Sequence, residues 1–149
     1  MRSELKILVD SCVFVDAFAP SSSGHAAAYR LLNRLVEKNV RVAMPAHGWF
    51  EVRCSWQRLK IEGKFVAPEF NGETRYPVDL IPIDDEFIDK YTSADIPFIK
   101  SGDHIWLAVA KVEGYPLVTS DVKMTKIAHR IGVIVFKPED LRDASEFIA

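Results

Sequence analysis

The sequence predicts an α/β fold in which a parallel β-sheet is covered by helices on both faces. Short apolar runs alternate along the chain with longer segments of helical periodicity. Gly and Pro residues separate most of these segments, as the turns between elements require. Strands that alternate with helices pair as parallel neighbours through right-handed crossovers, so we expect a sheet buried between two layers of helix.

The first half of the chain is expected to contain two strands and three helices. Lys6–Val9 is an apolar-rich run typical of a buried parallel strand, and Ser11–Ala19 predicts a short helix that ends at a proline. His25–Lys38 places its apolar residues on one helical stripe, and any of the three serines before it is a suitable N-cap. Val40–Met44 predicts the second strand, and Ala46–Glu62 predicts a helix that a glycine ends.

The second half continues the alternation after an irregular stretch. Residues 64–77 contain two prolines, a glycine and little periodicity, which makes them the best candidate for a flap or a partner contact. The predicted elements that follow are a strand at Val78–Ile83, a helix capped by Asp84 or Asp85 and running through Tyr91, a helix at Ser101–Glu113, a strand at Leu117–Thr119, a helix from Asp121 to Arg130, a strand at Val133–Phe136 and a last turn at Pro138–Leu141.

The composition is that of a soluble globular protein. With 149 residues, 48% of them hydrophobic, the chain is expected to form one domain over residues 1–149. A net charge of −2 gives no overall basic field of the kind that attracts nucleic acid. Cys12 and Cys54 are too few for a disulfide framework and are expected to be buried free thiols in a reducing cytosol. No apolar run approaches the ~20 residues that span a bilayer, and no signal peptide is recognisable, so we expect a cytoplasmic protein.

Four acidic residues are placed where they could meet at one edge of the predicted sheet. Asp10 directly follows the first predicted strand, and Asp121 follows the fourth. If those strands are neighbours, both carboxylates face the crevice at the carboxyl ends of the strands, where ligands of such folds bind. Asp103 begins the helix that leads to the fourth strand, and Glu51 lies one and a half turns into the helix at 46–62.

Each acid also has a purely structural interpretation. Asp10, Asp103 and Asp121 are suited to be helix caps or first-turn acids, which the helix dipole favours. Glu51 lies beyond the first turn of a largely apolar helix, so its alternative is an ion pair with Arg58 or an exposed position.

A cluster of these acids would call for a cation. Carboxylates that share a pocket raise each other's pKa unless a positive charge neutralises them. Hard oxygen ligands with few nitrogen or sulfur partners suit Mg²⁺ or Mn²⁺, and such sites commonly serve phosphoryl or phosphodiester chemistry.

Taken together, these segments resemble a PIN domain, and more narrowly the VapC-type toxins of toxin–antitoxin pairs. The resemblance covers residues 5–137 and rests on Ile-Leu-Val-Asp-Ser around Asp10, Glu51 in a helix after the second strand, Gly-Asp-His-Ile-Trp-Leu-Ala-Val-Ala around Asp103, and Leu-Val-Thr-Ser-Asp ending at Asp121. It implies a three-layer α/β/α fold with a five-stranded parallel sheet in the order 3-2-1-4-5.

The resemblance also implies an activity. The chain would be a Mg²⁺- or Mn²⁺-dependent endoribonuclease that hydrolyses RNA phosphodiester bonds to 5′-phosphate products, with an antitoxin protein as partner and a homodimer as assembly. Asp10, Asp103 and Asp121 would hold one or two cations, and Glu51 would complete or orient the set of ligands. The matching small hydroxyl positions, which would support the site, are Ser11 and Thr119.

Other side chains are candidates for contact with RNA. Arg53 and Arg58 form one basic group, and Lys123 and Lys126 form another beside Asp121. Their alternative is a solvated helix face. Three tryptophans could stack bases or belong to the core or a dimer interface, and these are Trp49, Trp56 and Trp106.

The chain departs from the family pattern at three places. His104 follows the third acid, where alanine is usual, and Lys123 stands where a fifth acid is common. Residues 64–77 do not match the extra helix that many such toxins carry. These departures bear on a second metal and on how a partner binds.

Two other classes remain open from the residues alone. The same fold without a competent site would be a binding or regulatory module, with residues 64–77 as the contact, and Mn²⁺ binding separates it from a nuclease. A response-regulator receiver or a phosphatase of the haloacid dehalogenase type is the third reading. Asp84 and Lys137 fit a receiver only loosely, and Asp10-Ser11-Cys12 lacks the Asp-x-Asp of the dehalogenases.

Overall fold

The strand-forming runs pair into one parallel sheet. The computed structural model describes residues 6–70, 72, 75–92 and 95–140, and in these residues the strands lie in the order β3-β2-β1-β4-β5. The predicted α/β class and the strand order implied by the family resemblance are therefore confirmed. The described elements are β1 (Lys6–Val9), α1 (Ser11–Ala17), α2 (His25–Glu37), β2 (Arg41–Pro45), α3 (Ala46–Ile61), β3 (Asp79–Ile81), α4 (Asp85–Thr92), α5 (Ser101–Glu113), β4 (Leu117–Val118), α6 (Val122–Arg130) and β5 (Val135–Phe136).

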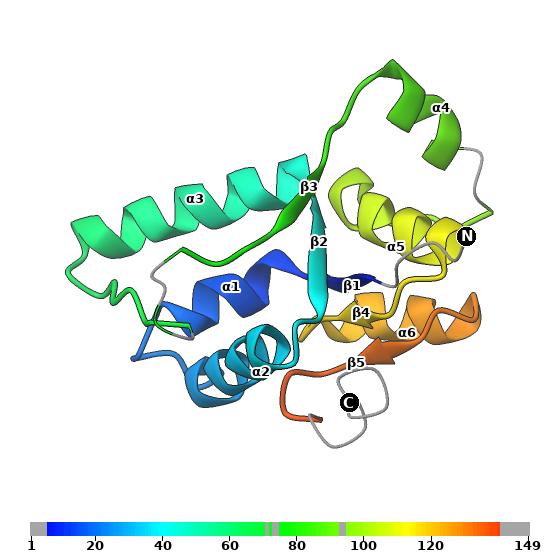
Figure 1. Cartoon of the computed structure of the whole chain (residues 1–149). Helices are drawn as coiled ribbons and strands as arrows, with labels where there is room; N and C mark the ends of the chain where they lie inside the picture. Colours follow the sequence, from blue (N-terminus) through cyan, green and yellow to red (C-terminus); the bar gives the residue numbers. More distant parts are fainter. Residues whose placement is uncertain (1–5, 71, 73–74, 93–94, 141–149) are drawn as a thin grey trace.

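Helices cover both faces of this sheet. Figure 1 shows α1, α2 and α3 together on one side and α5 and α6 on the other, with α4 next to α5. The central strand β1 is buried on both faces, since Ile7, Leu8 and Val9 are each at most 1% exposed. Such burial explains why this strand is continuously apolar instead of alternating.

Helix α2 begins at His25, as its apolar stripe predicted, but the predicted serine cap is wrong. Its buried residues follow the 3.6-residue period and are Ala28, Leu31, Leu32 and Leu35. No serine caps it: Gly24 is the N-cap residue and makes no side-chain cap bond. The Ser22 hydroxyl instead donates to Asp16 Oδ1 at 2.8 Å, which ties the loop to α1.

Two strands are shorter than the sequence predicts, for identifiable reasons. Strand β3 ends at Ile81 because Pro82 follows and has no N–H for a ladder bond. Strand β5 begins only at Val135 because the N–H of Val133 donates to Ala128 O at 2.9 Å and so completes the end of α6.

The irregular stretch at 64–77 is packed onto the helical layer over its described residues. Val66 donates its N–H to Phe18 O at 3.1 Å, and the Tyr29 hydroxyl donates to Glu69 O at 3.1 Å. Phe70 is fully buried, and the buried Tyr76 donates its hydroxyl to Leu32 O at 2.9 Å. These contacts make the described part a strap across α1 and α2 instead of the free flap that its composition suggested.

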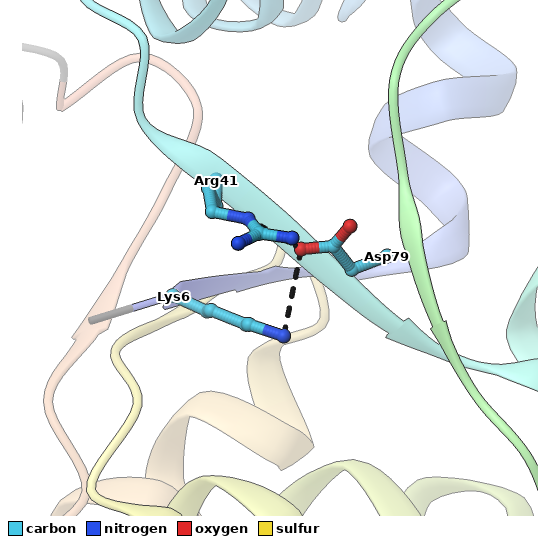
Figure 2. Close-up of polar contacts among 3 residues, drawn as sticks. All are labelled: Lys6, Arg41 and Asp79. Atoms are coloured by element: carbon cyan, nitrogen blue, oxygen red, sulfur yellow. Dashed lines mark hydrogen bonds and ion pairs between the residues drawn. The ribbon is translucent and has the colours of Figure 1, made fainter. Parts of the chain in front are cut away.

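An ion cluster joins the first residues of three strands. Asp79 accepts from Arg41 Nε at 2.8 Å and pairs with Lys6 Nζ at 3.5 Å, as Figure 2 shows. The Arg41 hydrogen bond is the main reason that the pKa of Asp79 is lowered. Because the strands are parallel, the cluster marks the amino edge of β1, β2 and β3, and the opposite edge is left for other side chains.

Two further predictions are limited by the described residues. The last turn is described only to Asp140, whose N–H donates to Lys137 O at 3.0 Å, and the tail beyond it lies outside the described residues. Among the helices described here, none is long and apolar enough to cross a membrane.

Candidate active site

Asp10 lies at the carboxyl end of the central strand. Its N–H donates to Val118 O at 2.9 Å, so β4 continues beside it, and its side chain is 7% exposed. Desolvation raises the pKa of its carboxyl, while donors from Thr119 (Oγ1 to Oδ2, 2.7 Å) and Cys12 (Sγ to Oδ2, 3.4 Å) act in the opposite direction. Asp10 occupies the N-cap position of α1, as its structural interpretation predicted, but its carboxylate makes no cap hydrogen bond to the helix.

Thr119 connects two of the predicted acids. Its fully buried hydroxyl donates to Asp10 and accepts the Asp121 N–H at 3.0 Å. Asp121 also caps α6, because its Oδ1 accepts the Met124 N–H at 2.8 Å. The structural interpretation of Asp121 is thus correct, and it places the residue beside Asp10, since β1 and β4 are paired neighbours.

Glu51 reaches the same edge from α3. The Ser11 hydroxyl lies 3.1 Å from Glu51 Oε2 and 3.4 Å from Asp10 Oδ1, so it stands between the two carboxylates. Glu51 is exposed. Together with Ser55, one helical turn later, and Cys12 it lines a shallow hollow.

Asp103 completes the group from the first turn of α5. Desolvation raises the pKa of its carboxyl, and the negative charges of Asp121 and Glu51 raise it further, while Lys100 and Lys123 lower it. The charge of Asp103 in turn raises the pKa of Asp10. Asp10, Glu51 and Asp121 are therefore each within electrostatic range of Asp103, although the four acids come from four separate parts of the chain.

The donors suit a hard divalent cation in chemistry and charge. No three His, Cys, Asp or Glu side chains in the described part of the chain converge closely enough to form a ready-made metal site. Carboxylates without a cation repel each other, and Mg²⁺ commonly keeps several waters as ligands. Desolvation is the main cause of the raised pKa of Asp10 and of Asp103, and the charges of neighbouring acids raise both further. A bound cation would offset both effects, so the donor chemistry of these residues fits Mg²⁺ or Mn²⁺.

The part of the chain that contains the four acids matches one known domain family. The sequence matches the family model of the PIN domain over residues 7–130, which includes all four acids. The chain belongs to the PIN domain family. A search of curated proteins gives no match.

Solved structures support the PIN fold. VapBC2 from Rickettsia felis, bound to a DNA fragment from its promoter, has 14% identity and a TM-score of 0.52, with 89% of this chain and 98% of that chain covered. VapC20 of Mycobacterium tuberculosis, a toxin that cleaves the sarcin–ricin loop, has 15% identity and a TM-score of 0.55, with 81% and 94% covered. FitAB bound to the IR36 DNA fragment has 19% identity and a TM-score of 0.56, with 89% and 95% covered. The predicted resemblance to PIN domains of VapC type is confirmed at the level of the fold.

The PIN fold excludes one of the alternative readings. A response-regulator receiver has the strand order 2-1-3-4-5, whereas this sheet has the order 3-2-1-4-5. The family match likewise replaces the dehalogenase reading.

The predicted RNA-contacting residues lie on two helices of this PIN domain. Arg53 and Arg58 are exposed on α3, and Lys123 and Lys126 are exposed on α6. Only Lys123 has an electrostatic link to an acid of the group, through Asp103, among the interactions resolved in the described residues. The tryptophans are mostly structural, because Trp56 and Trp106 are buried and Trp49 packs edge-on against Phe14 and Trp56.

Two contacts near the acids were missed from the sequence. Both cysteines were interpreted only as buried free thiols, and this is wrong for Cys54, which is exposed. Cys12 donates to Asp10, and its position two residues after that acid, at the start of a helix, was the available signal. His47 carried no signal at all, but its ring contacts the backbone of Gly102, the neighbour of Asp103.

Proposed function

We propose that this PIN domain is a Mg²⁺- or Mn²⁺-dependent endoribonuclease, with Asp10, Glu51, Asp103 and Asp121 as its catalytic and metal-binding residues. The observation that carries the proposal is the buried Asp10 carboxylate, which lies at the carboxyl edge of the sheet within electrostatic range of another acid. Burial of an acid with its pKa raised is costly for folding and is typical of functional sites.

The residues divide the work of phosphodiester hydrolysis. Asp10 would be the fixed cation ligand, because the Thr119 and Cys12 donors orient its Oδ2. Asp103 and Asp121 would complete the ligand set, and Glu51, held next to Ser11, would orient a ligand or the attacking water. When bound, the cation supplies stabilisation of charge on the phosphate and acidifies water for attack. Cleavage at the 3′-oxygen leaves a 5′-phosphate product.

Lys123 and Lys126 on α6, with Arg53 and Arg58 on α3, would follow the RNA backbone on either side of the acids. Their exposure leaves them accessible to a polyanion. The acids alone would repel RNA, so the cation and these side chains together would provide the attraction.

We further propose that the chain is the toxin of a toxin–antitoxin pair, since three solved proteins of similar fold are VapBC2, VapC20 and FitAB. A small gene directly upstream that encodes a protein able to bind and inhibit this chain would support this role. A homodimer is proposed at the hollow between α4 and α5, where Phe98 is 97% exposed beside an apolar surface.

The test of the activity is the cleavage of defined single-stranded and structured RNAs with Mn²⁺ and with a chelator. We expect cleavage only with the cation, and we expect Asp10→Asn to abolish it while the circular dichroism spectrum is unchanged. Asp89→Asn, an exposed acid on α4, is the matched control and should cleave normally. Unchanged cleavage by Asp10→Asn would refute the assignment. Failure of the unaltered protein to bind Mn²⁺ would favour a non-catalytic binding module.

A further inference from the structure

Helices α3 and α5 meet in close contact near the acids. A Cβ atom added to Gly48 would lie 2.4 Å from Cζ2 of Trp106, a side chain that is only 1% exposed. Glycine is therefore the residue that lets the two helices approach this closely. The amino ends of α3 and α5 form a tight seam as a result.

His47 adds the polar contact of this seam. Its Nε2 lies 3.0 Å from the carbonyl oxygen of Gly102, and its ring centroid lies 5.8 Å from that of Trp106. A carbonyl oxygen only accepts, so Nε2 must carry the proton and donate. Nδ1 is buried without a hydrogen-bond partner among the described residues, which fits the neutral tautomer with its proton on Nε2.

The same face of α3 carries Glu51, four residues after His47. A Cβ atom on Gly102 would lie 3.9 Å from Glu51 Oε1. Gly102 is therefore contacted by His47 and lies beside Glu51, while the next residue along α5 is Asp103. The contact between α3 and α5 at this seam therefore determines the distance between Asp103 and Glu51.

We propose that His47 is a positioning residue, whose hydrogen bond to the Gly102 carbonyl holds the first turn of α5 so that Asp103 faces Glu51. This role rests on the proposed function, because it matters only if the acids bind a cation together. His47 itself touches neither the acids nor the substrate in this arrangement, so it acts through the backbone of α5.

The test compares His47→Leu, which removes the donor, with His47→Gln, whose amide nitrogen can replace Nε2. Mn²⁺ affinity is measured by the electron paramagnetic resonance signal of the free ion, without RNA. We expect His47→Leu to weaken Mn²⁺ binding by about 10-fold, the size typical of lost support around a metal ligand, and His47→Gln to restore it. Hydrogen exchange should be faster in His47→Leu only, at the His104 amide, which donates to Lys100 O at 2.9 Å across the first turn of α5. His129→Leu, an exposed histidine on α6, is the matched control.

The outcomes separate this inference from the nuclease proposal. Equal Mn²⁺ affinity and equal exchange in His47→Leu and the unaltered protein would overturn the positioning role, as would a His47→Gln variant as weak as His47→Leu. Ring nitrogen shifts of the unaltered protein that place the proton on Nδ1 would overturn it without any variant. If the unaltered protein binds no Mn²⁺, the nuclease proposal fails. In that case the exchange experiment alone tests His47, and unchanged hydrogen exchange in His47→Leu would show that His47 does not position the first turn of α5.

Discussion

Thr119 is the residue on which two of the four acids depend. It is fully buried, it donates to Asp10 and it accepts the Asp121 N–H. Thr119→Val keeps the shape of the side chain but removes the donor to the buried Asp10 carboxylate and the acceptor of the Asp121 N–H. We expect a loss of about 1–3 kcal/mol in the free energy of unfolding, measured with urea.

The same substitution should change the pH dependence of metal binding. The Thr119 donor lowers the pKa of Asp10, so its loss raises that pKa and leaves more of the carboxyl protonated at a given pH. Protons compete with cations for carboxylates, and Mn²⁺ affinity in Thr119→Val should therefore fall more at pH 6 than at pH 8. Thr119→Ser should behave as the unaltered protein. A parallel decrease at both pH values would contradict this account.

Three of the candidate-site residues predicted from sequence follow strands. Asp10 and Thr119 directly follow β1 and β4, Asp121 comes two residues after Thr119, and parallel strands deliver such residues to one edge of the sheet. The contacts of Cys12 and His47 could not be predicted, because they depend on where a side chain points after the helices have packed. Residue spacing contains no such information.

At the scale of elements, the ends of helices and strands were both predictable to within two residues, but an error of two residues is half of a predicted strand as short as Val133–Phe136. The stripe of α2 and the glycine after α5 mark the ends of these helices in the sequence itself. The length of β5 depends on its partner β4 and on the end of α6, which are tertiary features. The strap at 64–77 was unpredictable for the same reason: Phe70 and Tyr76 are spaced without a period, yet both are buried.

The hollow between α4 and α5 leads to a prediction about assembly. It has a volume of about 520 Å³, and Ile88, Ile99 and Ile105 are among its apolar lining residues. Phe98 is one of the residues that line the hollow and is 97% exposed. In a two-fold dimer, the Phe98 side chain of each copy would therefore pack into the hollow of the other copy.

We therefore expect the chain to sediment as a dimer and Phe98→Ser to sediment as a monomer at the same concentration. Phe50→Ser removes a phenylalanine that is 71% exposed on α3 and should leave the dimer intact. A monomeric unaltered protein, or a dimer that survives Phe98→Ser, would exclude this surface as the interface.

On the scale of the whole molecule, the two edges of the sheet respond in opposite directions to pH. At the amino edge, the pKa of Asp79 is lowered by Arg41, so this residue contributes stability above its unfolded pKa and loses it as pH falls. The contribution is small, because exposed ion pairs are worth less than about 1 kcal/mol. At the carboxyl edge, burial raises the pKa of Asp10 and Asp103 above the ordinary 3.8, so both acids oppose folding increasingly as pH rises through their folded pKa.

A bound cation should reverse the effect at the carboxyl edge alone. Cations bind the ionised carboxylates of the folded state, and the raised pKa values of Asp10 and Asp103 leave more of each protonated at low pH, so Mn²⁺ should raise the Tm more at pH 7.5 than at pH 4. Asp10→Asn should raise the Tm in a chelator at pH 7.5, because it removes a desolvated charge, and should lose most of the Mn²⁺ response. Differential scanning calorimetry at the two pH values, with Mn²⁺ and with a chelator, measures both effects. If Mn²⁺ raised the Tm equally at pH 4 and pH 7.5, the ion would have to bind away from Asp10 and Asp103.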